Sequence, residues 1–120
     1  MSKLRLMMVD DNRTLLTALQ RGLSRSFEVT AHHDVSEALD DLASGGRYDA
    51  VLSDVCMYPV GGPEFRERVR KVRPELADRF VFMSGGADDP SFEAFLSSTV
   101  FLPKPFSIEG AVAAIRKVAR

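Results

Sequence analysis

Five short runs of apolar residues are spread along the chain, and polar or turn-forming residues follow each of them. The runs cover residues 4–9, 27–31, 48–53, 80–83 and 100–102. Short segments that are hydrophobic almost throughout are typical of strands buried on both faces of a parallel sheet. We therefore predict five buried strands.

The segments between these runs carry apolar residues at helical spacing behind a capping residue or an early proline. The predicted helices begin at Asp11 or Asn12, at Asp34 or Ser36, at Pro63, at Asp88 or Asp89, and at Ser107. The third of these is expected to bury Phe65, Val69 and Val72, and to end at Pro74. Strands that alternate with helices predict an α/β fold, with a doubly wound parallel sheet covered on both faces.

Composition adds limits to this picture. With 120 residues, 45% of them apolar and 28% charged, the chain fits one soluble domain with one substantial core. A formal charge of −1 argues against nucleic-acid binding by this domain. The single Cys56 cannot form an internal disulfide, and two histidines are too few for a zinc cluster. No apolar run suits membrane insertion or a signal peptide, so we expect a cytoplasmic protein.

Polar side chains occupy the ends of four predicted strands. Asp10 and Asp11 follow the first strand, Asp54 the third, Ser84 the fourth and Lys104 the fifth. The carboxyl ends of parallel strands meet at one edge of the sheet, where α/β proteins bind ligands. Neighbouring carboxylates repel each other by about 4 kcal/mol at 4 Å and an effective dielectric constant near 20. A divalent cation such as Mg²⁺ would offset this repulsion.

This combination of groups suits an aspartyl-phosphate acceptor. A metal ion and the Lys104 ammonium would stabilise the extra negative charge on Asp54, and the Ser84 hydroxyl could donate to a phosphoryl oxygen. A hydrolase that passes through aspartyl phosphate fits less well, because it needs a second carboxylate close to the nucleophile. After Asp54 the chain continues with Val-Cys-Met.

The sequence resembles the receiver domain of two-component response regulators and hybrid histidine kinases. The resemblance covers essentially the whole chain and rests on Asp10-Asp11, Asp54, Met83-Ser84-Gly85, Phe101 three residues before the lysine, and Lys104-Pro105. It implies a single receiver domain over residues 1–120, with a flavodoxin-like sheet in the strand order 2-1-3-4-5. The run after residue 83 and the Lys-Pro-Phe segment are slightly more similar to receivers of hybrid kinases.

The resemblance also implies roles for individual residues. Asp54 would accept a phosphoryl group from the phosphohistidine of a histidine kinase or a histidine phosphotransfer domain. Mg²⁺ or Mn²⁺ would bind Asp10, Asp11, Asp54 and the main-chain carbonyl of Cys56. Ser84 and Lys104 would hold the phosphoryl group, and Ser84 and Phe101 would form the switch. The peptide bond between Lys104 and Pro105 would be cis. Such a domain is a signalling phosphoacceptor that phosphorylates itself and slowly hydrolyses the product.

The sequence departs from the family pattern shortly after the acceptor. The family usually has proline four residues after the acceptor, whereas this chain has Tyr58 there and Pro59 next. This departure keeps a pseudo-receiver, a protein-interaction module without phosphotransfer, as the alternative.

A redox role for Cys56 is disfavoured by the nearby Asp54. The downstream partner is unknown, the output face would include Phe95 and Phe101, and phosphorylation could drive homodimerisation.

Overall fold

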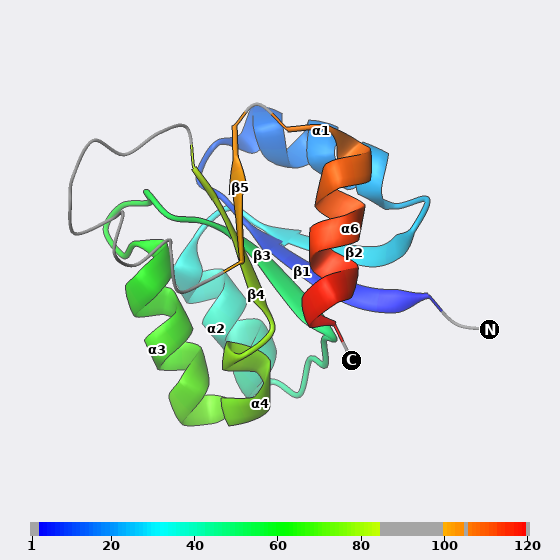
Figure 1. Cartoon of the computed structure of the whole chain (residues 1–120). Helices are drawn as coiled ribbons and strands as arrows, with labels where there is room; N and C mark the ends of the chain where they lie inside the picture. The colour runs from blue at the N-terminus through cyan, green and yellow to red at the C-terminus, as the bar shows by residue number, and fades with distance from the viewer. Residues whose placement is uncertain (1–2, 85–99, 105, 120) are drawn as a thin grey trace.

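A single parallel sheet forms the centre of the computed structural model, which describes residues 3–84, 100–104 and 106–119 (Figure 1). Its strands are β1 (Leu4–Val9), β2 (Phe27–His32), β3 (Ala50–Asp54), β4 (Phe80–Ser84) and β5 (Val100–Pro103). Their order across the sheet is β2-β1-β3-β4-β5, with every pair parallel. The predicted flavodoxin-like strand order is therefore confirmed.

The helices cover both faces of this sheet. They are α1 (Arg13–Leu23), α2 (Val35–Ala43), α3 (Gly62–Val72), the short α4 (Pro74–Ala77) and α6 (Ile108–Val118). Helices α1 and α6 pack on one face, and α2 and α3 pack on the other (Figure 1). In the described part of the chain, no helix has the length and hydrophobicity needed to cross a membrane.

The central strands supply both cores because successive side chains of a strand point to opposite faces. In β1, Leu6 and Met8 belong to the core under α1 and α6. Met7 and Val9 belong to the core under α2 and α3. All four side chains are fully buried. This two-sided burial is why the strand sequences are hydrophobic throughout and do not alternate.

Capping side chains set the start of three helices. Asn12 accepts a hydrogen bond from the backbone N–H of Leu15 at 3.1 Å, Asp34 caps α2 and Ser107 caps α6. The sequence allowed either Asp11 or Asn12 as the cap of α1. Because Asn12 caps the helix, the Asp11 carboxylate is not used as a cap.

The structure corrects three details of the sequence prediction. The third strand begins at Ala50 and not at Tyr48. Pro74 does not merely stop a helix, since it starts α4. Val72 is 48% exposed, whereas Leu76 of α4 is buried in the core under α2 and α3. The helix predicted from Asp88 or Asp89 lies outside the described residues.

Candidate functional site

Three carboxylates meet at the carboxyl edge of the sheet. Asp10 follows β1, Asp11 is the next residue, and Asp54 ends β3, which is the neighbour of β1 in the sheet. One carboxylate oxygen from each lies within 4.8 Å of the others. Asp10 is 0% and Asp54 7% exposed, whereas Asp11 faces solvent. The predicted convergence of the three acidic residues is therefore confirmed.

Backbone hydrogen bonds hold the two buried carboxylates in place. Asp10 accepts from the N–H of Asn12 at 2.9 Å, and its own N–H donates to the carbonyl of His32 in β2 at 3.3 Å. The backbone N–H of Cys56 donates to the Asp54 carboxylate. Both side chains are thus fixed by the turns that follow their strands.

Lys104 brings the opposing charge from the far side of the sheet. Its Nζ lies 3.5 Å from Oδ2 of Asp10 and 3.6 Å from Oδ1 of Asp54. Its backbone N–H donates to the carbonyl of Ser84 at 2.8 Å, which ties the end of β5 to the end of β4. The lysine is therefore an integral part of the acidic pocket formed by Asp10, Asp11 and Asp54.

The protonation equilibrium of Asp54 reflects this crowding. Burial, followed by the neighbouring Asp10 carboxylate, raises the pKa of Asp54 to about 6. Lys104 and the Cys56 N–H act in the opposite direction on the same pKa. Without a metal ion, the folded protein therefore tolerates the ionised carboxylate poorly at neutral pH.

The raised pKa of Asp54 predicts that the Asp54→Asn substitution stabilises the metal-free protein, by an amount that depends on pH. A carboxyl whose folded pKa lies above its unfolded value stabilises the fold at low pH, and that contribution is lost as pH rises from about 4 through about 6. At pH 7 we expect the variant to be more stable than the wild type by about 1–2 kcal/mol, and to lose this advantage near pH 4.

Urea unfolding in chelated buffer at both pH values measures the difference. Asp40→Asn serves as the control, because Asp40 is an exposed carboxylate on α2. A gain for Asp54→Asn that does not change with pH would contradict the assigned cause.

The donor set of the pocket fits a hard divalent cation. The three carboxylates carry a formal charge of −3 against the single ammonium of Lys104, and two of the three are buried. Oxygen ligands with excess negative charge are what Mg²⁺ and related ions select in proteins. An acidic cluster of this kind is typical of the metal site of receiver domains.

Of the remaining predicted site residues, Ser84 and Cys56 lie at the same edge, and Phe101 lies within β5, opposite Phe82. Ser84 is buried at the end of β4. Phe101 in β5 is partly buried against the core under α2 and α3. Cys56 is an exposed residue, but partial desolvation of its thiol and the Asp54 charge raise the pKa of that thiol, which is unfavourable for a reactive thiolate. The predicted cis bond between Lys104 and Pro105 lies outside the described residues.

The loop between β3 and α3 contains a feature that the sequence interpretation missed. A Cβ atom on Gly62 would lie 2.4 Å from the carbonyl oxygen of Asp54 and 2.9 Å from a ring carbon of Phe82. The only signal in the sequence was a Gly-Gly pair shortly after the acidic residue. In the same loop the Tyr58–Pro59 peptide bond is cis, and Tyr58 is 88% exposed.

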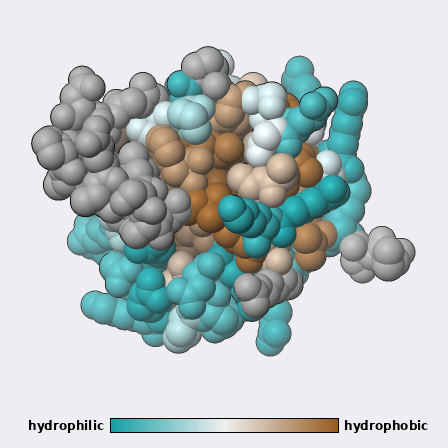
Figure 2. Space-filling model, viewed as in Figure 1, coloured by the Kyte–Doolittle hydropathy of each residue, from teal (hydrophilic) through white to brown (hydrophobic). Residues whose placement is uncertain are grey.

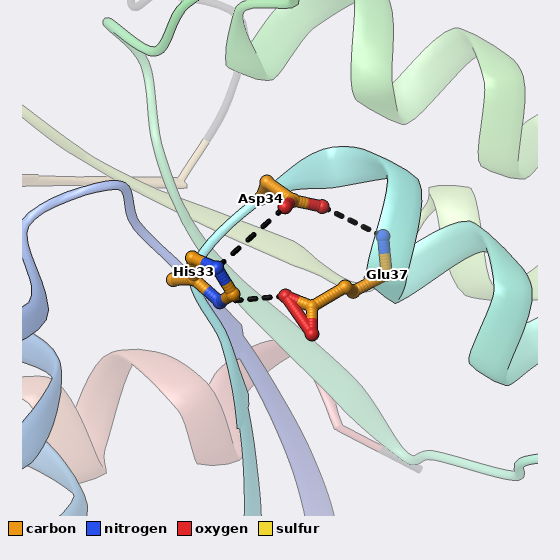
Figure 3. A group of neighbouring side chains, drawn as sticks. All are labelled: His33, Asp34 and Glu37. Atoms are coloured by element: carbon orange, nitrogen blue, oxygen red, sulfur yellow. Dashed lines mark hydrogen bonds and ion pairs between the residues drawn. The ribbon is translucent and has the colours of Figure 1, made fainter.

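A second cluster of potential metal ligands lies at the start of α2 (Figure 3). His33 Nδ1 is 2.6 Å from Glu37 Oε2, and His33 Nε2 is 3.7 Å from Asp34 Oδ2. The other oxygen of Asp34 accepts from the backbone N–H of Glu37 at 2.8 Å. These contacts are those of a capped helix start with a histidine paired to two carboxylates, and we assign no metal to them.

Comparison with known proteins identifies the family. The profile of the response regulator receiver domain matches residues 6–116. Response regulator MprA of Mycobacterium avium is 33% identical over an alignment of 129 residues, which covers 98% of this chain and 51% of MprA. The chain thus spans about half the length of the curated relatives it matches.

Solved structures show the same fold. A response regulator receiver protein from Sinorhizobium medicae superposes with a TM-score of 0.81 at 24% identity, over 97% of this chain and 94% of that one. Chemotaxis response regulator CheY4 of Vibrio cholerae gives 0.81 at 25% identity, over 98% and 99% of the two chains. These relatives give no specific support to a hybrid kinase receiver, and one domain over residues 1–120 stays a prediction. The chain belongs to the response regulator receiver domain family.

Proposed function

We propose that this receiver domain accepts a phosphoryl group on Asp54 in a reaction that depends on Mg²⁺ or Mn²⁺. The observation that carries the proposal is the pocket itself, in which a buried carboxylate on β3 lies beside two further carboxylates and 3.6 Å from an ammonium group. An ion pair with Lys104 requires only one carboxylate, and this pocket has three. A bound cation would balance the remaining negative charge.

Each residue has a distinct part in the proposed transfer. Asp10, Asp11 and Asp54 would hold the metal ion, together with the main-chain carbonyl of Cys56. A bound ion would neutralise part of the charge of the incoming phosphoryl group. An oxygen of Asp54 attacks phosphorus, and a P–O bond forms while the P–N bond to the donor imidazole breaks. The bonding electron pair leaves with the imidazole nitrogen.

Lys104 and Ser84 act on the transferred group. The Lys104 ammonium already lies beside Asp54 before transfer, so its positive charge is in place as negative charge accumulates on the phosphoryl oxygens. The Ser84 hydroxyl donates to one of these oxygens in the proposal. Because the Ser84 carbonyl accepts from the Lys104 N–H, a movement of either residue is passed to the other.

The output surface is proposed to be the side of the domain around β5 and α6. Figure 2 shows hydrophobic side chains gathered there, above the hydrophilic side of α3 and α4. Phe101 lies in β5, directly opposite Phe82 in the sheet register. Movement of Phe101 coupled to Ser84 would alter this surface for a downstream protein. Phe95, the other aromatic expected here, lies outside the described residues.

The proposed partners follow from the chemistry. The phosphoryl donor is the phosphohistidine of a histidine kinase or of a histidine phosphotransfer domain. Self-catalysed phosphorylation and slow hydrolysis of the product belong to the same proposal. Phosphorylation-dependent homodimerisation stays a prediction.

Beryllofluoride, a mimic of the phosphoryl group, tests the proposal directly. We expect Mg²⁺ and beryllofluoride together to raise the Tm of the 120-residue chain by several degrees more than Mg²⁺ alone, because ligands that bind only the folded state stabilise it. Asp54→Asn should remove this additional rise, whereas Asp40→Asn should keep it. If the wild type shows no additional rise, the pseudo-receiver alternative is favoured.

A further inference from the structure

A second charged pocket lies at the opposite edge of the sheet from the acidic pocket. It has a volume of about 370 Å³ and is lined by Arg5, Arg47, Tyr48, Asp49, Arg73, Glu75, Leu76 and Arg79. Arg5 lies near the start of β1, Asp49 directly precedes β3, and Arg79 directly precedes β4. The pocket is thus built by the amino ends of three neighbouring parallel strands and by α4.

The arginines of this pocket differ from those on the face of α3. Arg66, Arg68 and Arg70 each have a carboxylate oxygen within 4.0 Å. Within residues 3–84, 100–104 and 106–119, no carboxylate lies within this distance of the four pocket guanidinium groups. The lining contains four arginines and two acidic residues, which gives it a formal charge of +2.

Two of the four arginines are held by the frame of the pocket. Arg73 donates to the carbonyl of Gly46 at 2.9 Å and to that of Leu42 at 3.0 Å. The Arg5 guanidinium lies 5.6 Å from the centre of the Tyr48 ring. Arg73 is therefore held by neutral carbonyl groups, whereas Arg5 lies over an aromatic ring, and its charge also acts on the Asp41 carboxylate.

One of the two acidic residues of the lining, Asp49, is hydrogen-bonded to the backbone of Arg5. Asp49 Oδ2 accepts from the backbone N–H of Arg5 at 2.8 Å, and the Asp49 N–H donates to the Arg5 carbonyl at 2.7 Å. Its carboxylate thus joins β1 to the start of β3. Arg47 and Arg79 line the pocket, and no side-chain hydrogen bond or ion pair joins either guanidinium group to another residue in the described part of the chain.

We propose that this pocket binds a small polyanion that carries two or more phosphate groups. Planar guanidinium groups bind phosphate oxygens through paired, charge-assisted hydrogen bonds. The volume lies in the range of small-molecule sites, about 300–1,000 Å³. The carboxylates of the acidic pocket lie at the other end of the strands, so they do not oppose the ligand at close range.

Inorganic pyrophosphate is the probe, titrated calorimetrically into the 120-residue chain in metal-depleted buffer. The double variant Arg47→Gln/Arg79→Gln should bind at least about tenfold more weakly than the wild type. The matched control, Arg68→Gln/Arg70→Gln, removes the same charge from α3 and should bind within about twofold of the wild type. A parallel titration with adenosine diphosphate shows whether a nucleoside attached to the diphosphate adds affinity. The proposal is supported if either probe binds more weakly to the pocket variant and not to the control.

Three results would overturn the proposal. They are no binding of either probe at millimolar concentration, an equal loss in both double variants, and binding of long nucleic acid in place of both probes. Amide chemical shifts in the wild type should change at Tyr48, Asp49 and Phe80 and not at Asp54. Arg47→Gln alone, at an exposed side chain, tests the site without the double variant if that variant does not fold.

Discussion

Replacing Gly62 by alanine is expected to lower the free energy of unfolding by about 2–3 kcal/mol and to weaken metal binding at Asp54. The added Cβ would lie 2.4 Å from the Asp54 carbonyl oxygen, which is backbone and cannot rotate away. The Gly62 N–H also donates to the Val55 carbonyl at 2.9 Å, so the glycine is tied to the same turn. Relief of the clash must therefore move α3 or the end of β3.

Urea unfolding and a Mg²⁺ titration measure the two parts of this prediction. Gly110→Ala is the control, because among the described residues its Cβ would come close to a side-chain hydroxyl, that of Ser107 at 3.1 Å, and not to backbone. Alanine is the better helix former, so this control should unfold within about 1 kcal/mol of the wild type. The prediction is wrong if Gly62→Ala has the same free energy of unfolding and the same Mg²⁺ affinity as the wild type.

Replacing Lys104 by glutamine is expected to change metal binding and phosphoryl binding in opposite directions. The ammonium lies 3.5 Å from Asp10 and 3.6 Å from Asp54, so it competes with a cation for the same carboxylates. Its removal should tighten Mg²⁺ binding about three- to tenfold. Beryllofluoride, which carries negative charge, should bind at least about tenfold more weakly.

Titrations of each ligand, monitored by thermal unfolding or by amide chemical shifts, separate the two effects. Lys71→Gln removes the same charge from an exposed position on α3 and should leave both affinities unchanged. If Lys104→Gln weakens both ligands together, the lysine is a structural support of the pocket and not a partner of the phosphoryl group.

The site could be predicted from sequence because its chemistry depends on where strands end. Hydrophobic runs locate the strands, and parallel pairing brings their last residues to one edge. Asp10, Asp54 and Lys104 are 44 and 50 residues apart along the chain, yet each directly follows or ends a strand. Local patterns thus sufficed to place them together.

Other features depend on contacts that no local pattern records. Val72 has the spacing of a core residue but is 48% exposed, and Leu76 of α4 belongs to the core under α2 and α3. The importance of Gly62 arises from the approach of one loop to a neighbouring carbonyl. The polyanion pocket combines Arg5, Arg47 and Arg79 from three segments that carry no common motif. Only the folded arrangement of β1, β3 and β4 unites them.

The charges of the acidic pocket lower the stability of the metal-free protein, although the proposed function requires them. Burying Asp54 beside Asp10 raises its pKa and destabilises the metal-free protein at neutral pH. Functional sites commonly contain groups that are unfavourable for stability alone. A cation and a phosphoryl group would turn the same arrangement of charges into a favourable one.

The most direct test of phosphoryl transfer to Asp54 is the intact mass of the chain after incubation with a small acyl phosphate. We expect the wild type to gain the mass of a single phosphoryl group in the presence of Mg²⁺ and none in its absence. Asp54→Asn should gain none, and the control Asp40→Asn should behave as the wild type. A phosphorylated Asp54→Asn protein, or a wild type that stays unmodified with Mg²⁺ present, would contradict the assignment of Asp54 as the acceptor.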